Sequence, residues 1–260
     1  MASAIIGGLL SAGYEPDRLC AIDPSEAALA KLQSLGVKKV ELQAGPTLRK
    51  SELIIVAVKP QFMQAAAEGI KQHLSGGAVV MSVAAGISVS ALKTQLSDAG
   101  LPVVRCMPNT PALVGAGASG LFASPEVTAA QRAGIDAVMG VVGTTVWLEQ
   151  ERHIDVVTAI SGSGPAYFFA FMEAMIAAGE KMGLTHETAS QLTLQTALGA
   201  SKLASQLPEP ITELRQNVTS PGGTTERALQ SFNQDNLAGL VDRGMQACLD
   251  RAQEMAKEFG

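Results

Sequence analysis

The string Thr219-Ser-Pro-Gly-Gly-Thr-Thr-Glu226 contains the residues best suited to bind a small anion. A Ser-Pro-Gly-Gly turn that leads into a helix beginning near Thr224 presents free backbone amides, small hydroxyls and the positive end of a helix dipole. These donors suit a carboxylate. On the residues alone, a capped helix start without a ligand is the alternative.

Asp23 suits a different ligand. It ends the short strand predicted at residues 19–22, where an acidic residue of a dinucleotide-binding unit accepts hydrogen bonds from the adenosine ribose hydroxyls. The same residue suits the cap of the helix that begins near Pro24. The two roles are compatible, so Asp23 is a candidate cofactor-binding residue.

The string Ala57-Val58-Lys59-Pro60 comes at the end of the apolar strand predicted at residues 53–58. Open α/β sheets bind ligands at the carboxyl ends of their strands. Pro60 holds Lys59 in an extended conformation, from which its ammonium can reach a phosphate or a ribose hydroxyl. A solvated surface lysine is the alternative.

Two more strings combine proline with polar or glycine residues. Met107-Pro-Asn-Thr-Pro111 follows the strand predicted at residues 103–107 and would place Asn109 near a nicotinamide, unless the loop is only a rigid connector. Ser161-Gly-Ser-Gly-Pro165 precedes a helix, and its glycines either leave amides open to a ligand or allow two helices to cross closely.

Metal, hydrolytic and nucleic-acid chemistry are not indicated. The three histidines do not cluster, no Cys/His spacing fits a metal, and no Gly-x-Ser-x-Gly elbow occurs. A net charge of −5 without a basic cluster argues against nucleic acid and an anionic membrane surface. The scarcity of ionisable candidates suits hydride transfer to an electrophilic substrate, in which positioning provides most of the catalysis.

The composition predicts a cytoplasmic protein. The three cysteines are scattered (Cys20, Cys106 and Cys248), so we expect reduced thiols rather than a disulfide framework. We find no basic-then-apolar leader and no apolar run of about 18 residues, so we expect neither a signal peptide nor a membrane span.

The spacing of apolar residues predicts two domains. Residues 1–149 alternate strand and helix, with strands at 19–22, 53–58, 78–83, 103–107 and 144–148, which is typical of a Rossmann-type, doubly wound parallel α/β sheet that binds a dinucleotide. Residues 150–260 show only helical patterns, interrupted at 161–165. Their wide apolar faces predict burial against another subunit, so this part would be a helical dimerisation domain.

Four strings together resemble pyrroline-5-carboxylate reductases. They occur in the order of that family over essentially the whole chain, and the last is highly specific to it: residues 57–60, 105–111, 161–167 and 218–225. The resemblance implies reduction of the cyclic imine of 1-pyrroline-5-carboxylate to L-proline with NADH or NADPH, the last step of proline biosynthesis. It also implies a homodimer through the helical domain, with larger rings in many members.

The family resemblance assigns roles residue by residue. Ala57, Val58, Lys59 and Pro60 would contact the cofactor, and Asn109 would lie near its nicotinamide end. The substrate carboxylate and ring nitrogen would be held by residues of the last string: Val218, Ser220, Gly223, Thr224 and Thr225. Of these, Thr225 would hydrogen-bond the imine nitrogen, and we take Thr225 and Ser220 as the catalytic candidates.

Two departures from the family bear on cofactor binding. Members normally begin with a strand and Gly-x-Gly-Asn immediately before the residues that match Met1-Ala2, and both are absent here. An asparagine that many members place beside the adenosine falls near Ala44, in a segment that aligns poorly. We therefore expect the 260-residue chain to bind nucleotide weakly.

Two alternatives follow. Dehydrogenases of the 3-hydroxyacid type resemble this organisation but use a lysine on the long interdomain helix, and residues 165–178 contain none. The other alternative is a protein that dimerises through its helices but binds nucleotide poorly.

Overall fold

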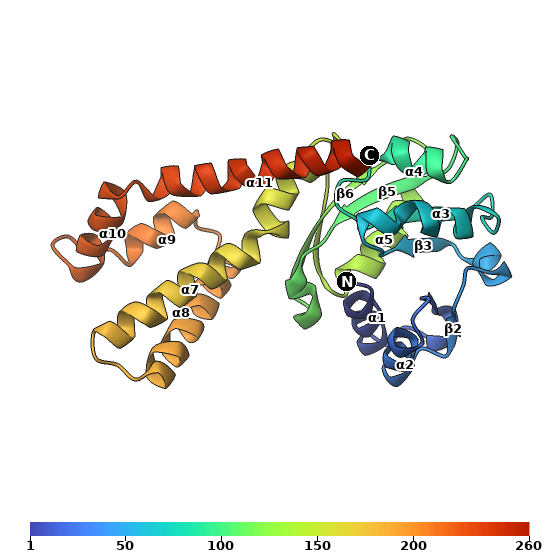
Figure 1. Cartoon of the computed structure of the whole chain (residues 1–260). Helices are drawn as coiled ribbons and strands as arrows, with labels where there is room; N and C mark the ends of the chain where they lie inside the picture. The colour runs from blue at the N-terminus through green and yellow to red at the C-terminus, as the bar shows by residue number, and fades with distance from the viewer. Residues whose placement is uncertain (260) are drawn as a thin grey trace. The chain divides into compact units, whose positions relative to one another are not determined.

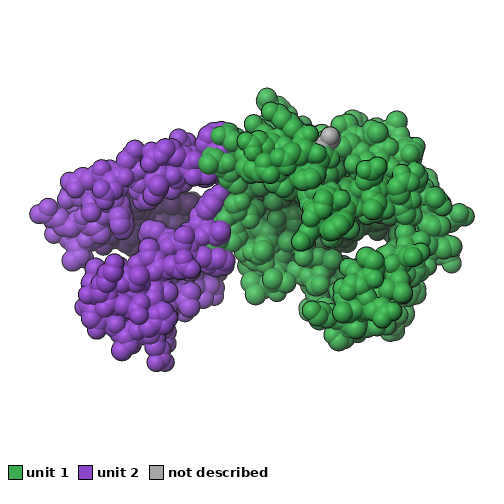
Figure 2. Space-filling model, viewed as in Figure 1, with its two compact units in different colours: residues 1–165, 247–260 green, residues 166–246 purple. Residues whose placement is uncertain are grey.

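The computed structural model describes residues 1–259 and divides the chain into two compact units (Figure 2). Unit 1 consists of residues 1–165 and 247–260, and unit 2 of residues 166–246. These bounds differ from the predicted division at 149/150, because residues 150–165 and the end of the last helix pack with the sheet of unit 1. The predicted fold class, a Rossmann-type α/β part followed by helices, is confirmed.

Unit 1 contains a five-stranded sheet of order β3-β4-β5-β6-β7 (Figure 1). Its strands are β3 (Leu53–Val56), β4 (Val79–Ser82), β5 (Val103–Met107), β6 (Gly117–Ala123) and β7 (Gly143–Trp147). The β3-β4, β4-β5 and β6-β7 pairs are parallel, whereas β5 and β6 are antiparallel. The sheet is therefore mainly parallel, and β6 is a strand that the sequence analysis missed.

Helices cover both faces of this sheet. Alternate residues of β4 point to opposite faces, so that Val80 joins one apolar cluster and Val79 and Met81 the other. The first cluster includes α3 (Met63–Lys71) and α4 (Val89–Gln95), and the second includes α1 (Ala2–Ser11) and α5 (Ala129–Gly140). Burial of these faces, rather than helix propensity, holds the short helices in place.

A second, two-stranded sheet stands apart from the first. β1 (Cys20–Ile22) pairs in parallel with β2 (Lys39–Glu41), and α2 (Glu26–Ser34) connects them. Among the described residues, β1 and β3 each have one edge without a strand partner. Figure 2 shows an opening through unit 1 between this lobe and the larger sheet. β2 is the second strand that the sequence analysis missed.

Residues 153–165 continue unit 1 as a largely helical run that is irregular at its centre. α6 (His153–Val157) passes into a π-helical turn (Thr158–Gly162), and α7 (Gly164–Lys181) follows. The predicted interruption at residues 161–165 is confirmed in part: regular α-helix stops at Val157, gives way to the π turn and a bend at Ser163, and resumes at Gly164.

The last helix also belongs partly to unit 1. α11 (Leu237–Phe259) ends with Phe259 against the α3–α4 cluster, and the Met255 carbonyl lies 3.0 Å from where a Cβ on Gly86 would be. Gly86 has a φ of +76°, so glycine is needed there both for the backbone conformation and for this close approach.

Unit 2 is entirely helical. It contains most of α7, then α8 (His186–Gln206), α9 (Ile211–Asn217), α10 (Thr224–Gln234) and the first part of α11. No strand follows Trp147 in the described part of the chain, which confirms the prediction for this half. The rings of Phe171 and Phe232 pack edge to face, with their centroids 6.4 Å apart.

The run His153–Lys181 corrects one expectation. By length and composition it is apolar enough to span a membrane, with a mean hydropathy of 1.2, whereas no such run was expected. The sequence analysis missed it because α6, the π turn and α7 were treated as interrupted. A single helix of this kind is weak evidence for a membrane, since soluble proteins also contain such helices.

Candidate active site

The predicted anion site is a tight turn followed by a helix start. The amide of Gly223 donates to the Ser220 carbonyl (2.9 Å), and Gly222 between them has a φ of +73°. Pro221 at the second position and a glycine with positive φ at the third are the requirements of a type II turn. Gly223 is then the residue before α10, and a Cβ there would lie 2.9 Å from the Ser220 carbonyl oxygen.

The side-chain hydrogen bonds of this turn come from residues other than the candidate ligands. Thr219 donates its hydroxyl to the Arg215 carbonyl (2.6 Å), and the Glu226 carboxylate accepts from the Gly222 amide (2.8 Å). No side chain caps α10, so the amides of its first turn keep their partial positive charge. Ser220 and Thr224 are exposed and Thr225 is half-buried, which leaves hydroxyls and amides together beside one turn.

Val218 completes the string. It follows α9 and is 65% exposed. Unit 2 thus brings the predicted substrate residues onto one loop and the helix start that follows it, which is an arrangement able to hold a carboxylate by backbone and hydroxyl donors.

In unit 1, Asp23 lies directly after β1. One carboxylate oxygen accepts from the Ser25 amide (2.8 Å), and Ser25, not Asp23, caps α2 by accepting from the Ala28 amide (3.3 Å). The expected helix cap is therefore displaced by two residues. Asp23 shapes the turn with one oxygen, and its second oxygen remains for a ligand.

The string 57–60 lies at the carboxyl end of β3. The strand ends at Val56, two residues earlier than predicted, so Ala57 and Val58 belong to the loop at the sheet edge. Lys59 is extended (φ −68°, ψ 149°) and exposed, and Pro60 begins a short 3-10 turn. The expected extended conformation of Lys59 is confirmed.

Asn109 does not expose its polar side chain at the tip of its loop. It is only 8% exposed, its amide nitrogen donates to the Ser161 carbonyl (3.0 Å), and its oxygen accepts from the Ala118 amide (2.9 Å). The side chain therefore joins the π turn to β6.

Two further features of unit 1 bear on the site. The first is the start of α1, where no side chain caps the helix, so the first amides can bind a phosphate. The second is the buried Arg105, whose guanidinium contacts Glu151 at 2.9 Å and Asp155 at 3.8 Å. Burial raises the pKa of Asp155, Arg105 opposes that shift, and Glu151 adds to it.

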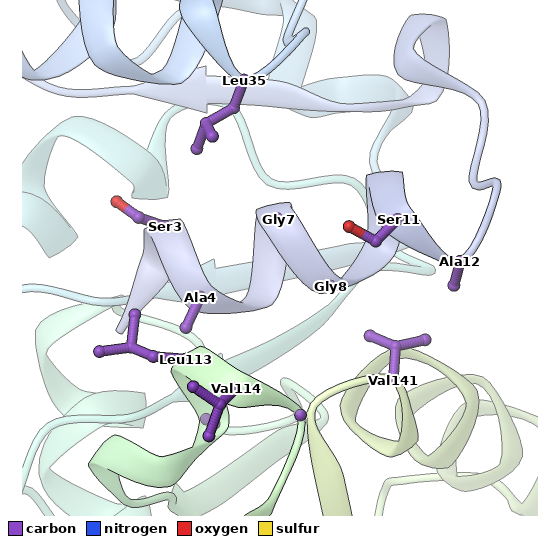
Figure 3. A pocket seen from close by; sticks show the side chains of 12 residues that line it. Ser3, Ala4, Gly7, Gly8, Ser11, Ala12, Leu35, Leu113, Val114 and Val141 are labelled. Carbon is purple, nitrogen blue, oxygen red and sulfur yellow. The ribbon is translucent and has the colours of Figure 1, made fainter.

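A cavity of about 600 Å³ lies beside α1 (Figure 3). Small residues of α1, including Ser3, Gly7 and Ser11, line it together with Leu113 and other aliphatic residues. None of the predicted site residues lines this cavity, and no charged side chain does. It is therefore not the candidate active site.

The fold and these residues define a class. The larger sheet has Lys59 after the carboxyl end of β3, the two-stranded sheet has Asp23 after β1, and an all-helical unit has a turn rich in hydrogen-bond donors. This is the organisation of an oxidoreductase that uses a nicotinamide dinucleotide. Residues 151–255 match the family model for pyrroline-5-carboxylate reductase dimerisation, and residues 1–86 match that for NADP oxidoreductase, coenzyme F420-dependent.

Full-length relatives show the family. The chain is 44% identical to a pyrroline-5-carboxylate reductase of Pseudomonas aeruginosa, over 100% of this chain and 95% of the relative. The chain belongs to the pyrroline-5-carboxylate reductase family.

Solved structures agree with this assignment. A pyrroline-5-carboxylate reductase from Coxiella burnetii is 38% identical, with a TM-score of 0.93 over 98% of this chain and 94% of that one. A pyrroline carboxylate reductase from Plasmodium falciparum, solved with NADP bound, is 27% identical with a TM-score of 0.84 over the same shares.

Proposed function

We propose that this oxidoreductase reduces the cyclic imine of 1-pyrroline-5-carboxylate to L-proline with NAD(P)H, the last step of proline biosynthesis. The observation that carries the proposal is the turn at Ser220–Gly223 with its uncapped helix start, because it supplies donors for a small carboxylate in the string most specific to the family. The full-length relatives, which are named for this reaction, support the same substrate.

The residues of unit 1 fit a nicotinamide dinucleotide. The uncapped start of α1 suits the pyrophosphate, the free oxygen of Asp23 suits the ribose hydroxyls, and Ala57, Val58, Lys59 and Pro60 form the loop at the sheet edge beside β3. The family match over residues 1–86 and the relative solved with NADP support this cofactor.

Substrate positioning falls to the chain's own groups in unit 2. The amide of Thr224 and the hydroxyl of Ser220 would hold the carboxylate, with Val218 offering a backbone contact. Gly223, whose amide donates to the Ser220 carbonyl, would keep the turn that presents them. The Thr225 hydroxyl would hydrogen-bond the ring nitrogen and keep the imine carbon facing the donor. When bound, the cofactor supplies the hydride that this carbon accepts. A protonated imine is already electrophilic, so no strong acid is needed in the protein.

The family match for the helical part supports a homo-oligomer, and we propose that a second copy of unit 2 covers its exposed apolar side chains. A cytoplasmic location is part of the proposal, in keeping with a soluble biosynthetic enzyme and three free cysteines.

The direct test is an assay of the purified chain with pyrroline-5-carboxylate and either reduced cofactor, followed by loss of the nicotinamide absorbance. Proline formation, measured in the same samples, confirms the product. A chain that self-associates but shows no turnover with either cofactor would support the alternative of a dimerising protein that binds nucleotide poorly.

A further inference from the structure

Asn109 has both ends of its amide engaged inside unit 1. Its nitrogen donates to the Ser161 carbonyl at 3.0 Å, and its oxygen accepts from the Ala118 amide at 2.9 Å, while the residue is 8% exposed. Breaking either bond would leave a buried polar group unpaired, at a cost of about 1–3 kcal/mol. The side chain is thus held by the protein and is not free to turn toward a ligand.

The segment that Asn109 holds is the π turn. A π turn inserts an extra residue into a helix and displaces the carbonyls around it from their usual partners. The Ser161 carbonyl finds its partner in Asn109 instead. The hydrogen bond therefore stabilises the irregular turn in particular, not only the loop that contains Asn109.

Close packing against strands of the sheet also holds the segment that contains the π turn in place. A Cβ added to Gly120 of β6 would lie 2.7 Å from a methyl of Val157, and one added to Gly162 would lie 2.7 Å from the Met107 methyl. At Gly120 the neighbour is the short, branched side chain of Val157, which has little room to move, whereas the Met107 methyl near Gly162 is the end of a flexible side chain. The helical run thus lies directly on β6 and on the end of β5.

The start of the run is held by the same strand. Arg105 of β5 contacts Glu151 at 2.9 Å, and the same carboxylate oxygen accepts from the Val89 amide at 2.8 Å. Beyond the turn, the Ser163 hydroxyl lies 3.2 Å from the Cys248 thiol of α11. β5 and its loop therefore anchor both ends of residues 151–161, and α11 lies against the residue that follows the turn.

We propose that Asn109 is a positioning residue: by holding Ser161 it fixes the π turn and the loop of residues 107–111 against each other within unit 1, and its side chain does not bind the cofactor. This inference rests on the proposed function. Displacements of about 1 Å in reacting groups can cost about 100-fold in rate.

The test uses Asn109→Asp, which keeps an acceptor for the Ala118 amide but loses the donor to Ser161. We expect kcat to fall about 10- to 100-fold while the cofactor Kd, from fluorescence titration, changes less than about twofold. The primary deuterium isotope effect on kcat should rise, because misaligned hydride transfer becomes rate-limiting. A purely structural role would lower the Tm without changing the isotope effect.

Two companion variants sharpen the result. Gly120→Ala disturbs the same segment without touching Asn109, and we expect the same pattern of lower kcat with unchanged cofactor Kd. Val114→Ala, at an exposed position in the same loop, is the matched control and should behave as the wild type. A cofactor Kd that rises in parallel with the loss of activity in Asn109→Asp, or an unchanged kcat, would overturn the proposal.

Hydrogen exchange separates this inference from the proposed function. In Asn109→Asp, peptides covering residues 158–164 should exchange faster than in the wild type, while peptides of α8 should not change. If the variant exchanges faster but the wild-type chain has no reductase activity, the proposed function is refuted, and the role of Asn109 in holding the π turn stands. Unchanged exchange would overturn the holding role whatever the activity.

Discussion

The two units differ sharply in how much of their apolar surface they bury. Unit 1 has two extended clusters in which side chains such as Met81, Leu121 and Met139 are fully buried. In unit 2, Ala189 and Thr193 are the buried residues among those described. Large apolar side chains of unit 2 are instead exposed, several of them by half or more.

The exposed residues of unit 2 follow helical spacing. Phe168, Phe171 and Met175 lie on one stripe of α7 and are exposed by 64%, 49% and 40%. A monomer rarely exposes such a continuous apolar surface to water. Unit 1 thus has a core of its own, whereas unit 2 depends on burial against another molecule, and the predictions below test this difference.

The largest effect is expected from Phe168→Glu. Each copy would lose about 1.5–3 kcal/mol of burial and gain a charge, so we expect the dissociation constant for self-association to rise at least about 100-fold. Light scattering coupled to size exclusion measures it. Phe62→Glu, at a position of unit 1 that is 57% exposed, is the matched control and should leave the oligomer intact. Unchanged association of Phe168→Glu would mean that this stripe is not the interface.

Thr225→Ala should affect substrate and not cofactor. We expect kcat/KM on pyrroline-5-carboxylate to fall roughly 10- to 100-fold, about 1.4–2.8 kcal/mol of transition-state stabilisation, because one hydrogen bond to the ring nitrogen is lost. The cofactor Kd should stay nearly constant, since the proposed nucleotide residues lie in unit 1. Steady-state kinetics and fluorescence titration check both; an unchanged kcat/KM would remove Thr225 from the mechanism.

Adding a strand and Gly-x-Gly-Asn ahead of Met1 should act on unit 1. The added strand would find free edges on β1 and β3, and the glycine turn would bring amides to the start of α1. We expect NADH and NADPH to bind at least about 10-fold more tightly than to the 260-residue chain, about 1.4 kcal/mol or more. Calorimetric titration of both chains decides it, and equal affinities would show that the turn is dispensable.

Cys106 gives unit 1 a pH dependence. Burial raises the pKa of this thiol from 9.0 to about 12, although Ser119 opposes the shift by hydrogen bonding. Its contribution to stability is complete below pH 9 and is lost as the pH rises toward 12, because the unfolded chain releases the proton first. Between pH 8 and 10 the wild type should lose about 1.4 kcal/mol more of its unfolding free energy than Cys106→Ala, measured by urea denaturation. Parallel pH curves would contradict this.

The smallest effect concerns cofactor choice. Asp23 has a carboxylate oxygen free to accept ribose hydroxyls, and its charge repels a 2′-phosphate, so the wild type should lean toward NADH. Asp23→Ser should improve the binding of NADPH relative to NADH by roughly fivefold, about 1 kcal/mol, while a serine oxygen can still accept from the Ser25 amide. If the wild type already prefers NADPH strongly, Asp23 only shapes the turn after β1 and does not set the choice of cofactor.

The sequence predicted most elements of unit 1 because buried parallel strands are continuous apolar runs. β5 was predicted with its observed bounds. β6 was missed because Gly117-Ala-Ser-Gly-Leu-Phe-Ala123 contains no β-branched residue, and its glycines serve a close helix approach that only the fold reveals.

The candidate site was predicted unevenly for a physical reason. The turn at residues 220–223 is local, so proline and glycine at adjacent positions indicate it directly. The partners of Asn109 lie at Ala118 and Ser161, and those of Arg105 at Glu151 and Asp155. Contacts over such separations leave no periodic pattern in one sequence.

The return of α11 to unit 1 also sets an order of events during synthesis. A chain made from its amino end normally completes its first domain first. Here unit 1 begins at residue 1 but takes Phe259 into its α3–α4 cluster, after all of unit 2 has been made. All of unit 2 has therefore been synthesised before the packing of unit 1 can be completed. The nascent sheet stays without this apolar contact until Phe259 has been synthesised.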